Sequence, residues 1–99
     1  MKGKNRTAKE KRFHDELARL GCIACYIEGR KNTYVSIHHV NGRTKQGAHM
    51  QVLPLCAPHH QDQCQGVIAV HPWKARFEER YGNQYDLIEK CKELINWQE

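Results

Sequence analysis

Apolar residues recur with helical spacing near the start of the chain. Phe13, Leu17 and Leu20 fall at positions i, i+4 and i+7, so they share one face of a helix. A T-x-x-E capping box at residues 7–10 precedes them, and Gly21 follows them as a stop signal. The pattern predicts a first helix of about 13 residues.

Two further helices are expected at the C-terminal end of the chain. Pro72 begins the first and Gly82 ends it, while Asn83 caps the second, with Asp86 three residues later. The apolar stripe expected on the first of these helices consists of Trp73, Phe77 and Tyr81. The face expected to be buried on the second consists of Leu87, Ile88, Cys91, Leu94 and Ile95, with Cys91 as a buried thiol.

The middle of the chain has the pattern of a β-hairpin. Residues 33–40 (TYVSIHHV) are β-branched and aromatic, and residues 51–55 (QVLPL) form a second short apolar run. The stretch between them, residues 41–50, is polar and contains glycine. We expect a helix next, from Cys56 to near Gly66, with proline in its first turn. Together these elements predict an α+β fold.

Length and composition limit how large the core can be. The chain has 99 residues, which suits a single domain over 1–99 with a short flexible basic tail at 1–6. Hydrophobic residues make up 39% of it and the mean hydropathy is -0.83. A domain this small gains from an additional staple such as a bound metal ion.

The charge balance favours a polyanionic partner. The formal net charge is +5 and the pI is about 9.1, which suits nucleic acid, although a soluble basic domain without such a role has the same composition. Arg43 and Lys45, in the loop between the strands, are candidates for contacts to DNA phosphates. A basic N-terminal arm could add affinity or be an ordinary solvated face, and consists of Lys2, Lys4, Arg6, Lys9, Lys11 and Arg12.

The cysteines point to metal binding in a reducing compartment. No stretch is apolar enough to span a membrane and no signal peptide opens the chain, so we expect a cytosolic protein. Cys22 and Cys25 are spaced C-x2-C, and Cys56 and His59 are spaced C-x2-H. Zinc takes four such ligands in a tetrahedron, and a two-residue spacer lets one tight turn supply two of them. The expected fold therefore has a turn with the first two ligands, then a β-hairpin, then two further ligands at the start of a helix. This is the arrangement of a treble-clef fold with a structural zinc ion.

Two other interpretations of the cysteine pairs are weaker. Cys22 and Cys25 could be small core residues, but this does not explain the matched spacing of the second pair. A thioredoxin-like redox pair would require a surrounding βαβ pattern, and the sequence has none.

Four histidines remain outside this zinc set. His38 and His39 end the first expected strand, and adjacent strand residues point to opposite sides, so the two should have different roles. His60 follows His59 on a helix, where neighbours diverge by about 100°, so His60 should face a second site. His71 is the fourth. Each could also be a solvated surface residue.

The order of these motifs resembles a known family. A CxxC pair, HH on a strand and PLCxxHH entering a helix are similar to the HNH nucleases, which have a ββα-metal core. The segment VHP at 70–72, followed by RFEERYG at 76–82, narrows the resemblance to phage recombination-enhancement, RecA-dependent (Ref-like) nucleases. The resemblance covers residues 22–82. It implies a ββα-metal core with a structural zinc, flanked by an N-terminal helix and two C-terminal helices.

The resemblance also implies roles for single residues. His38, the first histidine of the strand, occupies the family position of a ligand of the catalytic metal. His39 occupies the position of the general base. His60 falls on a second metal ligand. The usual ligand one turn later falls on Cys64, a departure from the common histidine, so His71 is expected to serve instead, with Cys64 as the alternative.

A second departure concerns the central asparagine of the HNH motif. Gln51 takes its place as an orienting residue, with an extra methylene that changes its reach. His49 lies nearby and is the alternative for this polar role.

These residue types suit phosphodiester hydrolysis. A neutral imidazole such as His39 can take a proton from water near pH 7, and a divalent ion can clamp phosphate oxygens. Mg²⁺, Mn²⁺ and Zn²⁺ are all candidates for the catalytic ion, although histidine ligands favour the softer ones. The resemblance implies cleavage of single- or double-stranded DNA to 5′-phosphate and 3′-hydroxyl ends, with a RecA filament as a possible partner, in a bacterial cell carrying the phage or prophage.

Two other functions fit the zinc motif. The chain could be a treble-clef zinc module that binds DNA or a protein without cutting, or a structural zinc domain of a phage assembly. Only an enzyme needs a set of histidines separate from the zinc ligands.

Overall fold

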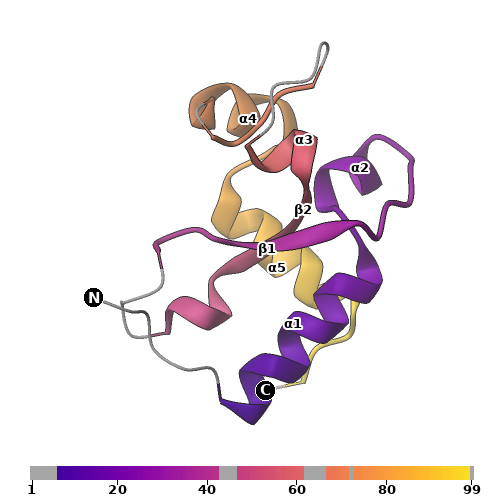
Figure 1. Cartoon of the computed structure of the whole chain (residues 1–99), viewed down its shortest axis with the longest axis vertical. Coiled ribbons are helices and arrows are strands. Elements are labelled where there is room, and N and C mark those ends of the chain that lie inside the picture. Colours follow the sequence, from indigo (N-terminus) through magenta and orange to yellow (C-terminus); the bar gives the residue numbers. More distant parts are fainter. Residues whose placement is uncertain (1–6, 43–46, 62–66, 72, 99) are drawn as a thin grey trace.

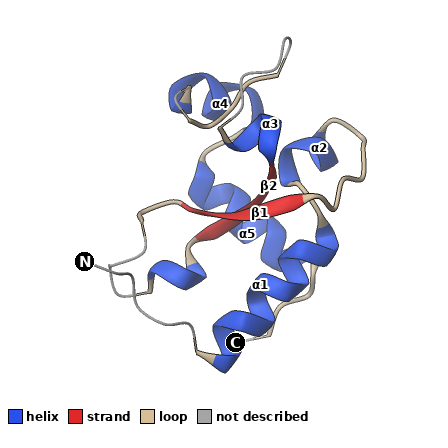
Figure 2. Ribbon diagram, in the orientation of Figure 1, coloured by secondary structure: helices blue, strands red, loops and turns tan. Residues whose placement is uncertain are grey.

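The computed structural model describes residues 7–42, 47–61, 67–71 and 73–98. Within them a two-stranded antiparallel sheet, β1 (Val35–His39) and β2 (Val52–Cys56), lies among helices (Figures 1 and 2). The fold is therefore α+β, as expected. The helices are α1 (Ala8–Leu20), α2 (Ile23–Ile27), the 3₁₀ helix η1 (Ala48–Met50), α3 (Ala57–His60), α4 (Lys74–Tyr81) and α5 (Gln84–Leu94).

The first helix follows its sequence pattern. The Thr7 hydroxyl accepts from the backbone N–H of Glu10, and the Glu10 carboxylate accepts from the N–H of Thr7, which completes the capping box. Gly21 ends the helix at a φ of 93°. Phe13 and Leu17 are fully buried against the hairpin. The prediction of a 13-residue helix is confirmed.

The hairpin pairs the two strands from Val35 opposite Cys56 to His39 opposite Val52. Every residue of β2 is buried, because α1, α2, α3 and α5 all pack against this strand. In β1, Val35, Ile37 and His39 are half-buried on one face, while the other face changes from exposed Ser36 to buried His38. In Figure 1, α1 lies on one side of the hairpin, and α3 and α4 lie at the opposite end.

The helix after β2 is shorter than predicted. It ends at His60, and residues 62–66, the rest of its expected length, lie outside the described residues. The carbonyls of His59 and His60 accept from the backbone N–H groups of Val70 and His71. In a continuing helix these carbonyls would accept from backbone N–H groups four residues later. Here they accept from the returning segment instead, and α3 ends at His60.

The C-terminal helices form as predicted, with two corrections to their buried faces. Trp73 precedes α4 and is 42% exposed, so it is not part of the apolar stripe. Leu94, in the last turn of α5, is 38% exposed. Pro72, expected to begin α4, lies outside the described residues. The short helix α2 was not predicted, because five residues are too few for a visible period.

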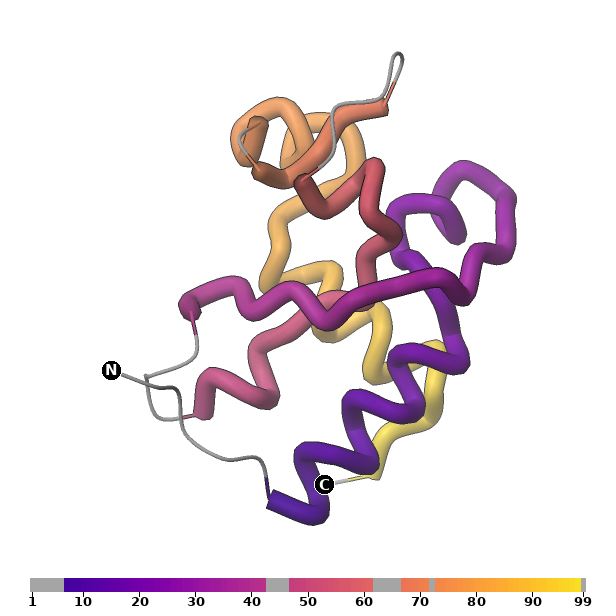
Figure 3. The backbone as a smooth tube through the Cα atoms, in the orientation of Figure 1, coloured from indigo at the N-terminus to yellow at the C-terminus, as the bar shows by residue number. Residues whose placement is uncertain are grey.

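The core lies between the hairpin and the helices α1, α4 and α5. Figure 3 shows the C-terminal end of the chain running beside α1, where the rings of Phe13 and Trp97 are 4.9 Å apart. The residues buried together include Phe13, Leu17, Ile23, Leu53, Leu55, Phe77, Leu87, Ile88 and Cys91. None of the helices in the described ranges is long and apolar enough to cross a membrane.

Candidate metal centres

Three groups of cysteine and histidine side chains converge within the described residues. In each group the donor atoms lie within 4.8 Å of one another. The Cys3His cluster consists of Cys22, Cys25, Cys56 and His59. The first histidine cluster consists of His38, His60 and His71, and the second consists of His14, His39 and His49.

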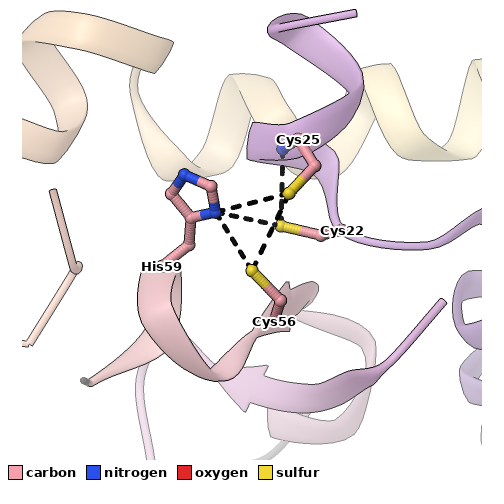
Figure 4. Close-up of side chains that lie close together, drawn as sticks. All are labelled: Cys22, Cys25, Cys56 and His59. Carbon is pink, nitrogen blue, oxygen red and sulfur yellow. Dashed lines mark hydrogen bonds between the residues drawn. The ribbon is translucent and has the colours of Figure 1, made fainter. Parts of the chain in front are cut away.

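The Cys3His cluster has the dimensions of a tetrahedral zinc site (Figure 4). Nδ1 of His59 lies 3.6 Å from the sulfurs of both Cys22 and Cys25, and 3.1 Å from that of Cys56. The sulfurs of Cys25 and Cys56 are 3.8 Å apart. Ligands of one tetrahedral zinc ion would be separated by about 3.6 Å for a nitrogen–sulfur pair and about 3.8 Å for a sulfur pair. All four predicted ligands therefore fit zinc.

Local structure explains why these four side chains meet. Cys22 caps α2, and its sulfur accepts from the backbone N–H of Cys25 at 3.4 Å, which turns both sulfurs to one side. Cys56 ends β2, and His59 lies in the single turn of α3 that follows. The hairpin brings this junction to α2, which packs against β2.

The surroundings favour a cation within the Cys3His cluster. Burial raises the pKa of the Cys22 thiol to about 12, so without a metal this thiol keeps its proton. A bound zinc ion displaces such protons and supplies the positive charge that buried thiolates require. The guanidinium of Arg30 lies 3.7 Å from the sulfur of Cys25, where it offsets the negative charge of three thiolates.

A chain of hydrogen bonds orients His59 from behind. Its Nδ1 faces the sulfurs, and its Nε2–H donates to the Tyr81 oxygen at 3.1 Å. The Tyr81 hydroxyl donates in turn to the carboxylate of Glu28 at 2.5 Å. A histidine ligand commonly donates its second N–H in this way, which fixes its tautomer and ring orientation. Sequence reasoning missed Tyr81 and Glu28 in this role, because the link exists only when α4 packs over the cluster.

The first histidine cluster lies beside the Cys3His cluster at the same strand-to-helix junction. His38 comes from β1, His60 from α3, and His71 from the segment that returns along α3. The ring of His38 lies 5.0 Å from those of both His60 and His71, and the latter two are 5.5 Å apart. His38 is buried while His71 is exposed, so the group opens towards solvent on one side.

A hydrogen bond to Gln84 sets the tautomer of His38, and a contact with Ser36 orients His60. The amide oxygen of Gln84 can only accept, so His38 donates from Nε2 at 2.8 Å and carries its lone pair on Nδ1. Nδ1 of His60 lies 3.0 Å from the hydroxyl of Ser36. Burial lowers the pKa of His38 to about 4, so the ring is neutral at pH 7, which is the form that binds metals. The donor set of three imidazoles fits a divalent ion.

His39 does not join the histidines with which it was grouped by sequence. It faces away from His38 on β1, and its Nε2 lies 2.9 Å from Nδ1 of His49. His14, on α1, completes this second cluster and donates from Nε2 to the carbonyl oxygen of His49 at 2.6 Å. His14 was not among the predicted site residues. Its place on the buried face of α1, three residues before Leu17, is the signal that could have indicated it.

The remaining predicted site residues lie apart or outside the described structure. Gln51 is exposed, and its side-chain oxygen accepts from Asn41 at 2.6 Å. Cys64, Arg43 and Lys45 lie outside the described residues, so their roles stay predictions.

Comparison with known protein families decides the class of the molecule. Residues 6–96 match the model of a family described as recombination enhancement, RecA-dependent nuclease. The chain belongs to this family. Membership makes the chain a nuclease, and it confirms the part of the sequence resemblance that concerned RecA-dependent nucleases. The match spans all three clusters.

Proposed function

We propose that the chain is an HNH-type, metal-dependent DNA endonuclease with a treble-clef, ββα-metal core. In this proposal the Cys3His cluster holds a structural zinc ion. The first histidine cluster holds the catalytic divalent ion, which could be Mg²⁺, Mn²⁺ or Zn²⁺. The observation that carries the proposal is the convergence of three imidazoles from separate segments next to the Cys3His cluster, with one exposed side. A purely structural zinc module has no use for this second group.

The ligands of the first histidine cluster would be His38, His60 and His71. When bound, a divalent ion there supplies charge relief on a phosphate oxygen and on the departing 3′ oxygen. The neutral state of His38 and its bond to Gln84 keep one ring nitrogen directed into the group. Cys64 remains the alternative third ligand.

His39 is proposed as the general base that takes a proton from the attacking water. This role comes from the family resemblance: His39 is half-buried at the end of β1, directly after His38, and its side chain lies on the opposite face of the strand. The ring of His49 lies edge-on to it at 5.0 Å and holds its orientation. This contact supports His49, rather than Gln51, in the polar middle role of the HNH motif.

DNA is the proposed substrate, and RecA filaments on DNA are the proposed partner, following the family name. The net charge of +5 favours binding to phosphates. Arg43 and Lys45 remain the proposed phosphate contacts in the hairpin loop. The logarithm of the binding constant should then fall steeply with the logarithm of salt concentration, whereas a flat dependence would contradict these contacts. A nuclease directed by RecA acts where the chromosome lies, so we propose the bacterial cytoplasm as its location.

A plasmid-nicking assay with Mg²⁺ or Mn²⁺ tests the proposal. We expect His39→Ala to lower the cutting rate by about 10²- to 10⁴-fold, the usual contribution of a general base. Zinc in the Cys3His cluster and the circular dichroism spectrum should not change. His71→Gln removes an exposed ligand and should also abolish cutting. Tyr34→Ala is the control, because Tyr34 is 90% exposed just before β1 and belongs to none of the clusters.

Two outcomes would contradict parts of the proposal. Equal cutting by wild type and His39→Ala would remove His39 as the base. Absence of cutting by the wild type, with and without RecA and single-stranded DNA, would favour a zinc module that binds without cutting.

A further inference from the structure

The second histidine cluster brings together three elements that are far apart in the sequence. His14 comes from α1, His39 from β1 and His49 from η1. The helix α1 packs against both of the other elements. His14 and His49 are 3% and 7% exposed, so this is a built, enclosed group rather than a chance gathering on the surface. We propose that it is a further metal site, which takes a divalent transition metal ion such as Zn²⁺.

The hydrogen bond of His14 determines which of its nitrogens would bind. A carbonyl oxygen can only accept, so the 2.6 Å contact to the backbone of His49 places the proton of His14 on Nε2. In the neutral ring the lone pair is then on Nδ1. A histidine that donates one N–H to a backbone carbonyl and coordinates through its other nitrogen is the usual arrangement at metal sites.

The other two rings already have nearly the spacing of coordinated ligands. Nε2 of His39 and Nδ1 of His49 are 2.9 Å apart, and one ring nitrogen from each of the three histidines lies within 4.8 Å of the others. Nitrogens on one tetrahedral zinc ion are about 3.3 Å apart. The rings of His14, His39 and His49 also lie at steep angles to one another, between 69° and 84°. An ion bound here would displace the proton shared by Nε2 of His39 and Nδ1 of His49, and the side chains would rotate so that each ring directs one lone pair at the ion.

A carboxylate next to the cluster offsets part of the charge of an ion. Glu10 lies one helical turn before His14 on α1. The backbone N–H of Thr7 is the main cause that lowers the pKa of Glu10, and electrostatic interaction with His49 and His14 makes a smaller contribution. The Glu10 carboxylate therefore acts electrostatically on both rings. Imidazole donors with a carboxylate nearby suit zinc, nickel or cobalt better than magnesium or calcium.

This site is separate from the first histidine cluster. His38 and His39 are neighbours on β1, and adjacent strand side chains point to opposite faces. Each joins a different group of three, and no described histidine belongs to both groups. Six imidazoles therefore form two sites of three.

Occupancy of the new site affects the proposed chemistry through His39. A ring nitrogen that coordinates an ion cannot accept a proton at the same time. Zinc in the second histidine cluster would then withdraw the general base, and cutting with Mg²⁺ or Mn²⁺ should fall as the site fills. This consequence rests on the proposed function, whereas the metal site itself does not.

Counting bound zinc ions by native mass spectrometry tests the site directly. The full chain would be equilibrated with excess ZnCl2 and desalted. We expect His14→Gln to carry one ion fewer than the wild type. Glutamine retains an N–H at the position of Nε2, so the bond to the His49 carbonyl is kept while the Nδ1 ligand is lost. Lys11→Gln is the control, since Lys11 is exposed on the same helix.

A double variant separates the two histidine clusters. His71→Gln should also lose one ion, and His14→Gln combined with His71→Gln should lose two. If His14→Gln unfolds the chain, His49→Leu replaces it, because the His49 backbone carbonyl still accepts from His14. Equal ion counts in the wild type and His14→Gln would overturn the site. A double variant that loses no more than either single variant would also overturn it, because the six histidines would then share one ion.

The nicking assay distinguishes the two proposals. Unchanged cutting while the additional ion binds would remove His39 as the base and leave the metal site in place.

Discussion

The phenol oxygen of Tyr81 lies 3.1 Å from Nε2 of His59 and extends the Cys3His cluster into a chain that ends at Glu28. Tyr81 is buried, at 8% exposure, and comes from the last turn of α4. A helix near the C-terminal end therefore fixes the orientation of a ligand from the hairpin junction. Stability of the metal site and packing of α4 are coupled through this one hydroxyl.

Tyr81→Phe should weaken zinc binding without removing any ligand. The ring keeps its packing against Phe77, but His59 loses the acceptor that fixes its tautomer. Loss of an outer partner of this kind costs about 10- to 100-fold in metal affinity. Competition with a chromogenic chelator measures the change. Tyr85→Phe is the matched control, because its hydroxyl donates to Asn41, which is not part of the Cys3His cluster. An equal loss of zinc affinity in both variants would contradict the hydrogen-bonded chain from His59 to Glu28.

Cys22→Ser should unfold the protein at room temperature or release its zinc. Structural zinc contributes its binding free energy to folding, and a small domain has little core with which to replace it. Circular dichroism and zinc content report the two results. Cys91→Ala tests the same loss of a buried sulfur away from the cluster, and should keep zinc and fold at a cost of about 1 kcal/mol. A folded, zinc-loaded Cys22→Ser protein would contradict a structural role for zinc in this cluster.

The Cys3His cluster could be predicted because its signals are local. Two pairs of ligand-type residues, each pair separated by two positions, can be recognised from the sequence without knowing the rest of the fold. The capping box at residues 7–10 is likewise contained within one turn, and its predicted helix is confirmed. Short-range geometry of this kind leaves few alternatives.

The second histidine cluster could not be predicted in the same way. His14 and His49 are separated by 35 positions and meet only because α1 packs across the hairpin. The alternation of β1 did predict that His38 and His39 would differ in their surroundings. It did not indicate which neighbours each would have, since these come from α1, α3 and η1. The spacing of residues in the sequence does not show which helices and strands pack against one another.

The end of α3 shows the same limit for secondary structure. Pro58 and the apolar run predicted where the helix begins, but backbone bonds from Val70 and His71 determine where it ends. Those partners are ten or more positions away in the sequence. A local sequence pattern contains no information about partners at that distance.

Gly21 should be the less replaceable of two glycines that have positive φ values. Gly21 and Gly29 have φ values of 93° and 86°. A Cβ on Gly21 would lie 2.6 Å from the carbonyl oxygen of Asn32, whereas one on Gly29 meets nothing within 4 Å. That same carbonyl accepts from the N–H of Cys22 at 2.8 Å, so its displacement would disturb the Cys3His cluster.

The two alanine variants compare a glycine of positive φ in open space with one that also has a ψ of -177° and a backbone atom in the way of a Cβ. Gly29→Ala should cost about 1 kcal/mol, the penalty for a left-handed residue with a Cβ. Gly21→Ala adds the backbone clash and should lower the melting temperature at least twice as much, with weaker zinc retention. Thermal unfolding monitored by circular dichroism measures both. Equal melting temperatures would show that the loop around Asn32 moves to accommodate the Cβ of Gly21→Ala without loss of stability.

The buried thiol of Cys91 should make stability depend on pH in the alkaline range. Burial in α5 raises its pKa from 9.0 to about 12. Between these values the unfolded chain releases the proton while the folded chain keeps it. The unfolded state then binds fewer protons, so the free energy of unfolding falls as pH rises from about 9 towards 12.

Cys91→Ala isolates this contribution from those of other groups that titrate in the same range. The variant should lose less stability than the wild type between pH 8 and pH 10.5, as measured by urea unfolding of zinc-loaded protein. Peptide mapping after iodoacetamide treatment gives an independent measure, because a protonated, fully buried thiol reacts only when the chain unfolds. Rapid modification of Cys91 in the native protein at pH 8, or parallel pH profiles for the two proteins, would show that the thiol ionises as readily in the folded chain as in the unfolded one.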